Sequence, residues 1–151
     1  MILVTGGTGL VGAHLLMDLL KHETPIRAIY RSDDALKKVR KIFTFYNVKW
    51  EQTLQKIEWV KSDLLNPEIL IDAFENVEYV YHCAAMVSFN KADKTKLFKV
   101  NIEGTANIVN LSLTSGVKKF CHVSSTATIG KAQKDGIRDE DCIWENEIEE
   151  N

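Results

Sequence analysis

The sequence has little cysteine and little proline, and no long apolar run. Of its 151 residues, 3 are cysteine and 2 are proline. Three cysteines without a Cys-x-x-Cys spacing exclude a disulfide scaffold and are typical of free thiols in a reducing cytoplasm. The apolar stretch from Leu10 to Leu20 contains His14 and Asp18, whereas a membrane-spanning helix needs about 20 apolar residues. We therefore expect a cytoplasmic protein with no membrane partner.

The four histidines also lack a metal-binding pattern. No His-x-x-x-His, His-Glu-x-x-His or Cys/His cluster is present, so we expect no metal site. The net charge is −2: a basic surplus over residues 1–134 is offset by an acidic end, 135–151. The surplus suits an anionic ligand but is too small to indicate a nucleic-acid partner.

What is present is the composition of an ordinary globular domain. Apolar residues make up 45% of the chain and charged residues 26%, close to average usage. A chain of this length can bury a real core. We expect one domain over residues 1–151.

Short apolar runs alternate with stretches of helical period. The patterns predict strands at 2–4, 26–30, 57–61, 78–83 and 119–124, and helices at 9–22, 33–45, 66–76 and 93–115; residues 47–56 are ambiguous. This alternation is typical of an α/β fold with a doubly wound parallel sheet and helices on both faces. The expected strand order is 3-2-1-4-5, and a ligand is expected at the carboxyl ends of the strands, near the switch point between the first and fourth strands.

A glycine-rich loop lies between the first predicted strand and helix, and reads Thr5, Gly6, Gly7, Thr8, Gly9, Leu10, Val11, Gly12. Gly6 allows a tight turn, Gly9 a close approach of the backbone to a pyrophosphate, and Gly12 close packing of the helix. The helix N-terminus offers free N–H groups to phosphates. Because Ala13-His14 follow, the loop is not a Walker A motif. The loop therefore predicts a dinucleotide site.

The residues after the second strand bear on the choice of cofactor. An NAD site places a carboxylate there to bind the ribose 2′-hydroxyl, but this chain has Arg31 and Ser32. A guanidinium can hold a 2′-phosphate with paired hydrogen bonds. We therefore predict NADP, with NAD as the second choice. Two alternatives to this prediction remain. A shifted turn would bring Asp33 or Asp34 towards the cofactor, or Arg31 would be an exposed charge of a loop.

Together these residues resemble the extended short-chain dehydrogenases/reductases, in the epimerase/dehydratase branch that includes dihydroflavonol reductase-like and 3β-hydroxysteroid dehydrogenase-like enzymes. The resemblance covers residues 1 to about 130 and implies a Rossmann fold. It rests on the glycine loop and on four further segments: Asp63-Leu64, His82-Cys83-Ala84-Ala85, Asn101 to Thr105, and Val123 to Gly130.

The resemblance implies a role for each segment. It places Asp63 and Leu64 at the adenine, and Cys83, Ala84, Ala85 and Ser124 at the cofactor. It makes Ser125 the catalytic hydroxyl and Asn101 a second catalytic residue. The residues themselves leave alternatives open: Asp63 as a helix-capping or turn aspartate, Ala84 and Ala85 as core packing, Asn101 as a side chain that binds backbone or water or as an exposed helix asparagine, and Ser124 or Thr126 in place of Ser125.

The chemistry of the family also needs a Tyr-x-x-x-Lys pair, in which the tyrosine is the general acid or base. No tyrosine of this chain has a lysine four residues later, and every tyrosine precedes Ser125. We therefore expect the N-terminal cofactor portion of a longer oxidoreductase that transfers hydride between NADP(H) and a small-molecule carbonyl or alcohol, and that is inactive as this piece. A nucleotide-sugar epimerase/dehydratase and a non-catalytic NADP-binding regulatory or scaffold protein are the alternatives, and a homodimer remains an option.

Overall fold

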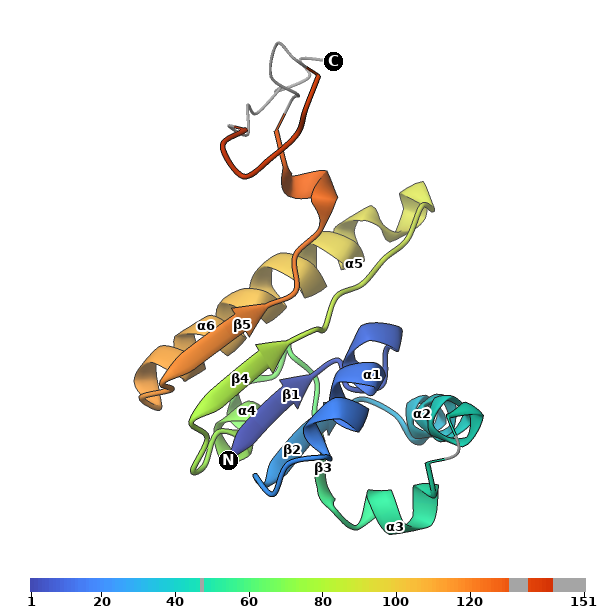
Figure 1. Ribbon diagram of the computed structural model, residues 1–151. Helices are drawn as coiled ribbons and strands as arrows, with labels where there is room; N and C mark the ends of the chain where they lie inside the picture. Colours follow the sequence, from blue (N-terminus) through green and yellow to red (C-terminus); the bar gives the residue numbers. More distant parts are fainter. Residues whose placement is uncertain (47, 131–135, 143–151) are drawn as a thin grey trace.

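The computed structural model describes residues 1–46, 48–130 and 136–142; most of the acidic end lies outside them. Five parallel strands form one sheet in the order β3-β2-β1-β4-β5, and helices cover both of its faces (Figure 1). The predicted fold class and strand order are both confirmed. The switch point between β1 and β4 lies in the middle of the sheet, where the glycine loop begins.

The strands are short and parallel throughout. Every residue of β1 is buried, as is typical of a strand covered on both faces. The registers pair Val4 with Ala28 on one side of β1 and with Tyr81 on the other. The strand bounds are β1 Ile2–Thr5, β2 Ile26–Tyr30, β3 Ile57–Lys61, β4 Tyr79–His82 and β5 Lys119–His122.

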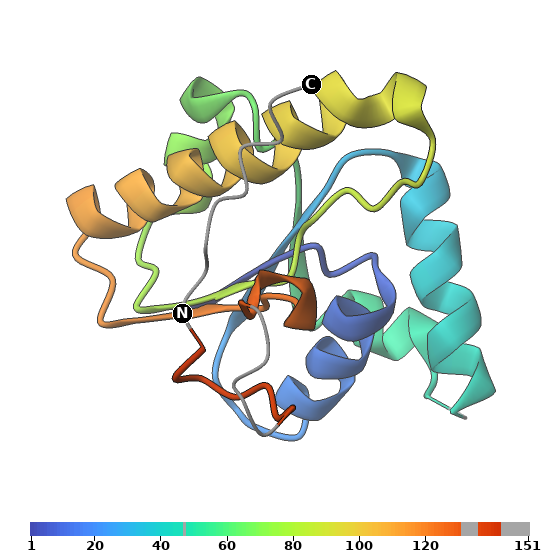
Figure 2. The same cartoon turned by 90° about the horizontal axis from the view of Figure 1, so that it is seen from above.

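Two separate cores lie on the two faces of the sheet (Figure 2). On one face α1 (Leu10–Leu19) and α2 (Asp33–Phe45) bury Leu16 and Phe43 against the sheet. On the other face α4 (Pro67–Ala73) and α6 (Gly104–Thr114) bury Leu70 and Ile108. Asn66 caps α4 and Pro67 begins it, as the sequence predicts.

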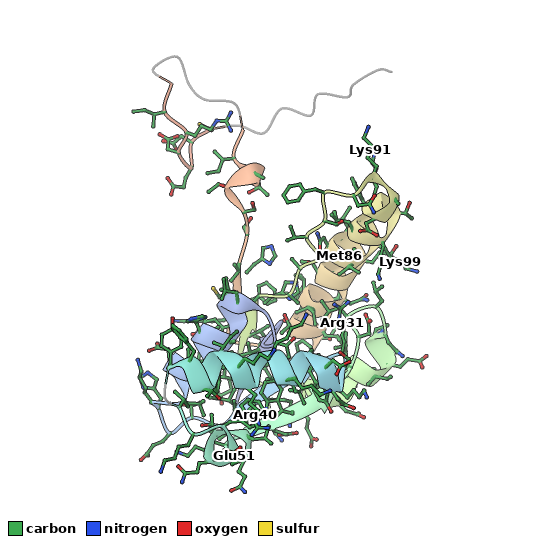
Figure 3. All side chains as sticks on the ribbon, turned by 90° about the vertical axis from the view of Figure 1, so that its right-hand side faces the viewer. Arg31, Arg40, Glu51, Met86, Lys91 and Lys99 are labelled. Carbon is green, nitrogen blue, oxygen red and sulfur yellow. The ribbon has the colours of Figure 1, made fainter. Side chains whose placement is uncertain are left out.

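The ambiguous segment 47–56 contains a short helix, α3 (Trp50–Leu54). Its Trp50 ring packs edge-on against Phe43 at a centroid distance of 5.6 Å. An ion pair of 3.1 Å joins Arg40 of α2 to Glu51 of α3 (Figure 3). The packing of Trp50 stabilises this short helix. The sequence could not predict it from helical periodicity, because five residues are too few to show a periodic pattern.

The helix predicted over 93–115 is helical throughout but is not one regular α-helix. The turn η1 (Lys91–Asp93) leads into α5 (Lys94–Phe98), then the π-helical turn η2 (Lys99–Glu103), then α6. Such π-turns are rare and often mark functional sites. Gly116, with φ of 68°, ends the helix as predicted.

Candidate functional site

A cavity of about 260 Å³ lies at the carboxyl ends of β1, β2, β3 and β4. Its walls come from the four segments that directly follow these strands and from the beginning of α2. Nine predicted site residues line it: Gly6, Thr8, Gly9, Arg31, Asp63, Leu64, Cys83, Ala84 and Ala85. The cavity is therefore where the strand order predicts a ligand.

The glycine loop forms the floor of this cavity. Gly6 has φ of 69°, and a Cβ at this position would collide with the backbone of Ala84. A Cβ on Gly12 would collide with the carbonyl oxygen of Gly6, so this glycine lets α1 pack onto its own loop. Gly9 is the N-cap of α1 and lines the cavity. The helix therefore directs its first N–H groups towards the cavity.

Two cations line the cavity at the end of β2. Arg31 follows β2 directly, and Lys38 lies on α2 one turn after Ala35, which also lines the cavity. Arg31 is exposed and forms no ion pair within residues 1–46, 48–130 and 136–142. Figure 3 shows Arg31 on the same side of the molecule as Met86 and Lys99.

The two aspartates at the start of α2 pair with lysines outside the cavity. The Asp34 carboxylate accepts a hydrogen bond of 2.7 Å from Lys37, which lowers the pKa of Asp34. Asp33 pairs with Lys61 of β3 at 3.5 Å. Neither aspartate lines the cavity. Ser32 occupies the N-cap position of α2, but its side chain makes no capping hydrogen bond.

Asp63 both stabilises a turn and lines the cavity. Its Oδ1 accepts a hydrogen bond of 2.9 Å from the Leu65 amide, and the side chain remains exposed. The next residue, Leu64, is buried. Its carbonyl accepts a hydrogen bond of 2.8 Å from Asn107 of α6. The turn role and the ligand role of Asp63 are therefore compatible.

A buried hydrogen-bonded chain lies beneath the cavity. The ring of His82 is fully buried, with Nδ1 2.6 Å from the Thr5 hydroxyl and Nε2 3.0 Å from the Thr105 hydroxyl. Burial, with a smaller effect of His122, lowers the pKa of His82 to about 4. A neutral imidazole can donate from one nitrogen and accept at the other. His82 therefore joins β1, β4 and α6, and Thr5 faces this chain rather than the cavity.

The segment after β4 presents small side chains to the cavity. Cys83, Ala84 and Ala85 all line it. Burial, with a smaller effect of Cys121, raises the pKa of the Cys83 thiol, so the thiol stays protonated at neutral pH. The next residue, Met86, is bound by the Asn101 side chain: Oδ1 accepts from the Met86 amide at 2.8 Å, and Nδ2 donates to the Met86 carbonyl at 2.9 Å.

The predicted catalytic serine lies at the carboxyl end of β5, outside the cavity. Ser125 is exposed and begins the turn η3 (Thr126–Thr128), where its Oγ accepts a hydrogen bond of 3.1 Å from the Ala127 amide. The Ser125 hydroxyl proton remains available to donate. Ser124 contacts the Thr128 hydroxyl at 3.2 Å, and Thr128 donates to the Ser125 carbonyl at 2.6 Å.

The remaining predicted site residues do not line the cavity. These are Thr5, Gly7, Leu10, Val11, Gly12, Ser32, Asn101, Ser124 and Ser125. The cavity has six further residues that sequence reasoning missed: Ile29, Tyr30, Ala35, Lys38, Ser62 and Val100. The sequence does indicate that Lys38 and Ala35 belong together, because Lys38 lies three residues after Ala35 on a predicted helix and so shares the same helix face.

Comparison with known proteins identifies the family. Residues 2–147 match the family described as the NAD dependent epimerase/dehydratase family. The chain belongs to this family, and the predicted resemblance is confirmed. The description of the family as NAD dependent supports binding of a nicotinamide dinucleotide.

The individual relatives are longer proteins. The chain is 32% identical to "Sterol demethylase protein B" of Methylococcus capsulatus, over 85% of this chain and 35% of the relative. It is 31% identical to a "Putative dihydroflavonol 4-reductase" of Synechocystis sp., over 89% of this chain and 35% of the relative. A solved short-chain dehydrogenase/reductase superfamily protein of Agrobacterium tumefaciens, with bound NAD, aligns with TM-score 0.67 and 26% identity over 91% of this chain and 38% of that structure. The chain thus spans about a third of the relatives it matches.

In the described part of the chain, no three His, Cys, Asp or Glu side chains are grouped so that they could hold a metal ion. No helix in that part is both long enough and apolar enough to cross a membrane.

Proposed function

We propose that this chain is the dinucleotide-binding portion of an oxidoreductase that transfers hydride between NADP(H) and a carbonyl or alcohol substrate. One observation carries the choice of NADP: Arg31 and Lys38 both line the cavity, whereas Asp33 and Asp34 are paired with lysines outside it. A carboxylate at this position would repel a 2′-phosphate, and the two cations attract one.

The residues of the cavity fit the parts of such a cofactor. The first N–H groups of α1 hold the pyrophosphate, and Gly9 leaves room for it. Arg31 and Lys38 hold the 2′-phosphate, and Asp63 accepts a hydrogen bond from the adenine amino group. Ala84 and Ala85 leave space beside the nicotinamide ribose. When bound, the cofactor supplies or accepts the hydride.

Ser125 acts on the substrate in this proposal. Its Oγ already accepts from the Ala127 amide, so its own proton points to a second acceptor. A substrate carbonyl oxygen is such an acceptor, and its hydrogen bond strengthens as negative charge develops on it. The proton that completes the reaction comes from a Tyr-x-x-x-Lys pair that we place in adjoining sequence of the parent protein.

Binding titrations test the cofactor choice. We expect this chain to bind NADPH more tightly than NADH. Arg31→Ala and Lys38→Ala should each remove a charge-assisted contact worth roughly 1.5–3 kcal/mol, and so weaken NADPH binding without a matching loss for NADH. Lys41→Ala, at an exposed lysine of the same helix that does not line the cavity, is the matched control. Equal affinities for the two cofactors in the unmodified chain would refute the NADP assignment.

The alternatives make different predictions for the parent protein. A nucleotide-sugar epimerase regenerates its cofactor in each cycle, so it would not consume NADPH in proportion to product. A regulatory or scaffold protein would bind NADPH and would lack the Tyr-x-x-x-Lys pair. Net NADPH oxidation with a ketone or aldehyde supports the reductase. The same proposal includes a cytoplasmic location and a homodimer. The location is supported by the three free thiols, Cys83, Cys121 and Cys142, which a reducing compartment allows.

A further inference from the structure

Two carboxylates lie close in the chain to the two cations of the cavity. Asp33 and Asp34 begin α2, two and three residues after Arg31. Lys38 lies four residues after Asp34 on the same helix, and opposite charges at this spacing form ion pairs on one helix face. Pairing of either cation with a carboxylate would neutralise the charge at which we place the 2′-phosphate.

Each aspartate is instead paired with a lysine that does not line the cavity. Lys37 donates to the Asp34 carboxylate at 2.7 Å, and Lys61, the last residue of β3, lies 3.5 Å from the Asp33 carboxylate. The hydrogen bond from Lys37 is the main cause of the lowered pKa of Asp34, and the charge of Lys38 contributes less. Asp34 therefore lies within electrostatic reach of the cavity lysine and is hydrogen-bonded to the neighbouring one.

The two cations of the cavity are left without ion pairs. Within residues 1–46, 48–130 and 136–142, neither Arg31 nor Lys38 is paired with a carboxylate. An ion pair would have to break before either cation could hold a phosphate, and the free energy needed to break it would weaken binding. The unpaired cations are thus preorganised for an anionic ligand.

The two lysines reach the start of α2 from different elements. The register of β2 against β3 pairs Lys61 with Tyr30, the residue that precedes Arg31. Lys61 therefore approaches from the sheet, whereas Lys37 approaches from the next turn of α2 itself. Both ion pairs are exposed, and exposed pairs contribute little to stability. Their loss should therefore leave the fold intact.

We propose that Lys37 and Lys61 are positioning residues that set the preference for NADP(H), because they hold the two aspartates away from the cations of the cavity. The proposal rests on the proposed function. Without Lys37, Asp34 should pair with Lys38 in place of its present partner. Without Lys61, Asp33 should remain as an uncompensated negative charge near the 2′-phosphate. NADH has a hydroxyl group in place of this phosphate, so its binding should change little.

Titrations of this chain with NADPH and NADH test each lysine. Lys37→Met keeps the aliphatic part of the side chain and removes the charge. It should weaken NADPH binding roughly 3- to 10-fold, the size of a charge interaction near an exposed surface, with NADH affinity within about twofold. Lys61→Met should act in the same direction but less strongly, because its ion pair is longer. Lys41→Met, at an exposed lysine of α2 that does not line the cavity, is the matched control and should change neither affinity.

Removal of the aspartate separates the positioning role from a direct attraction between the lysine and the cofactor. In an Asp34→Asn background, Lys37→Met should change NADPH affinity by no more than about twofold, because the carboxylate that the lysine holds is absent. An Asp33→Asn background should suppress the effect of Lys61→Met in the same way. Lys37→Arg should keep the NADPH affinity of the unmodified chain, since a guanidinium also pairs with a carboxylate.

Three outcomes would overturn the positioning role. The first is an equal loss of NADPH affinity on Lys37→Met with and without Asp34→Asn, because the lysine would then act on the phosphate directly. The second is an equal weakening of NADPH and NADH, which is the result of a structural role. The third is an unchanged preference for NADPH in both Lys37→Met and Lys61→Met. Equal affinities for the two cofactors in the unmodified chain would instead overturn the proposed function, so the two failures are distinguishable.

Discussion

The inner strands β1 and β2 and the edge strand β5 differ in how completely they are buried. β1 and β2 have nine residues between them, of which eight are buried and Tyr30 is partly buried. In β5, by contrast, only Phe120 is partly buried, and the other three residues are exposed. The segment 123–128, which carries Ser125, is exposed as well. The proposed cofactor cavity thus adjoins buried strands, whereas Ser125, the proposed catalytic hydroxyl, lies at an exposed edge of the sheet.

The two parts of the proposed function divide along this difference. Dinucleotide binding is proposed at the glycine loop, the end of β2 and the loop after β4, which adjoin the buried strands. The proposed substrate chemistry uses Ser125 together with a Tyr-x-x-x-Lys pair, and no such pair occurs in residues 1–151. His82 lies at the boundary, hydrogen-bonded to Thr5 on one side and stacked on His122 of β5 at 5.2 Å on the other.

The largest expected effect is on turnover. This chain should bind NADPH and yet oxidise it at or near background with a panel of ketones and aldehydes. The missing general acid alone accounts for ~10²–10⁴ in rate, and lost positioning of the substrate adds to this. The measurement is NADPH oxidation by the purified chain, compared with the full-length parent. Saturable turnover that Ser125→Ala removes would show that another acid acts within this chain.

The sequence was sufficient for the layout and for most of the cavity wall. Strand order, the glycine loop, Arg31 and the alanines after β4 follow from local patterns and from the rule that ligands bind at the carboxyl ends of strands. Thr5 and Asn101 were assigned to cofactor and catalysis, but their partners, His82 and Met86, lie 77 and 15 residues away. The pairing of Thr5 with His82 depends on the register of β1 against β4, and that of Asn101 with Met86 on how the helical segment crosses the sheet; periodicity specifies neither.

The next effect is on dinucleotide affinity. Gly9→Val should reduce NADPH binding by a factor on the order of 100 or more, because a branched side chain enters the cavity and separates the phosphates from the N–H groups of α1. The fold should survive, since the only atom within 4 Å of the added Cβ is the Gly6 carbonyl oxygen, at 3.3 Å. Fluorescence titration and circular dichroism measure the two properties.

Gly12→Val is the contrasting variant. Its Cβ would collide with Gly6 and Gly7 backbone atoms, so this substitution should lower the free energy of unfolding as well as binding. Normal binding by a folded Gly9→Val variant would place the phosphate site elsewhere.

A third effect is on stability in acid. The pKa of His82 is about 4 in the folded chain and 6.5 in the reference state, so folding favours the neutral ring. The contribution of the neutral His82 ring to the free energy of unfolding is complete above pH 6.5. It is lost as the pH falls towards 4, because the unfolded chain then binds a proton that the folded chain does not. Over this pH range the free energy of unfolding should fall by about 3 kcal/mol. Urea denaturation of the unmodified chain between pH 7 and pH 4 measures this loss.

His82→Gln removes the titrating group and should flatten the pH dependence in that window, although the variant is less stable at pH 7. A profile for His82→Gln that is as steep as that of the unmodified chain would assign the acid sensitivity to other groups.

The smallest expected effect lies in the less packed end of the sheet. Gly116 has φ of 68° and precedes β5, and a Cβ at this position would meet nothing within 4 Å. Gly116→Ala should therefore cost only the conformational energy of a left-handed residue, about 1 kcal/mol. If β5 and the inner strands differ as their burial indicates, this cost should appear as faster amide exchange in β5, with β1 and β2 unchanged. Gly136→Ala, at a similar φ of 80° in a loop, should leave both groups of amides as they are. Equal acceleration of β1 and β5 amides by Gly116→Ala would mean that the sheet unfolds as one unit, and that burial does not divide it.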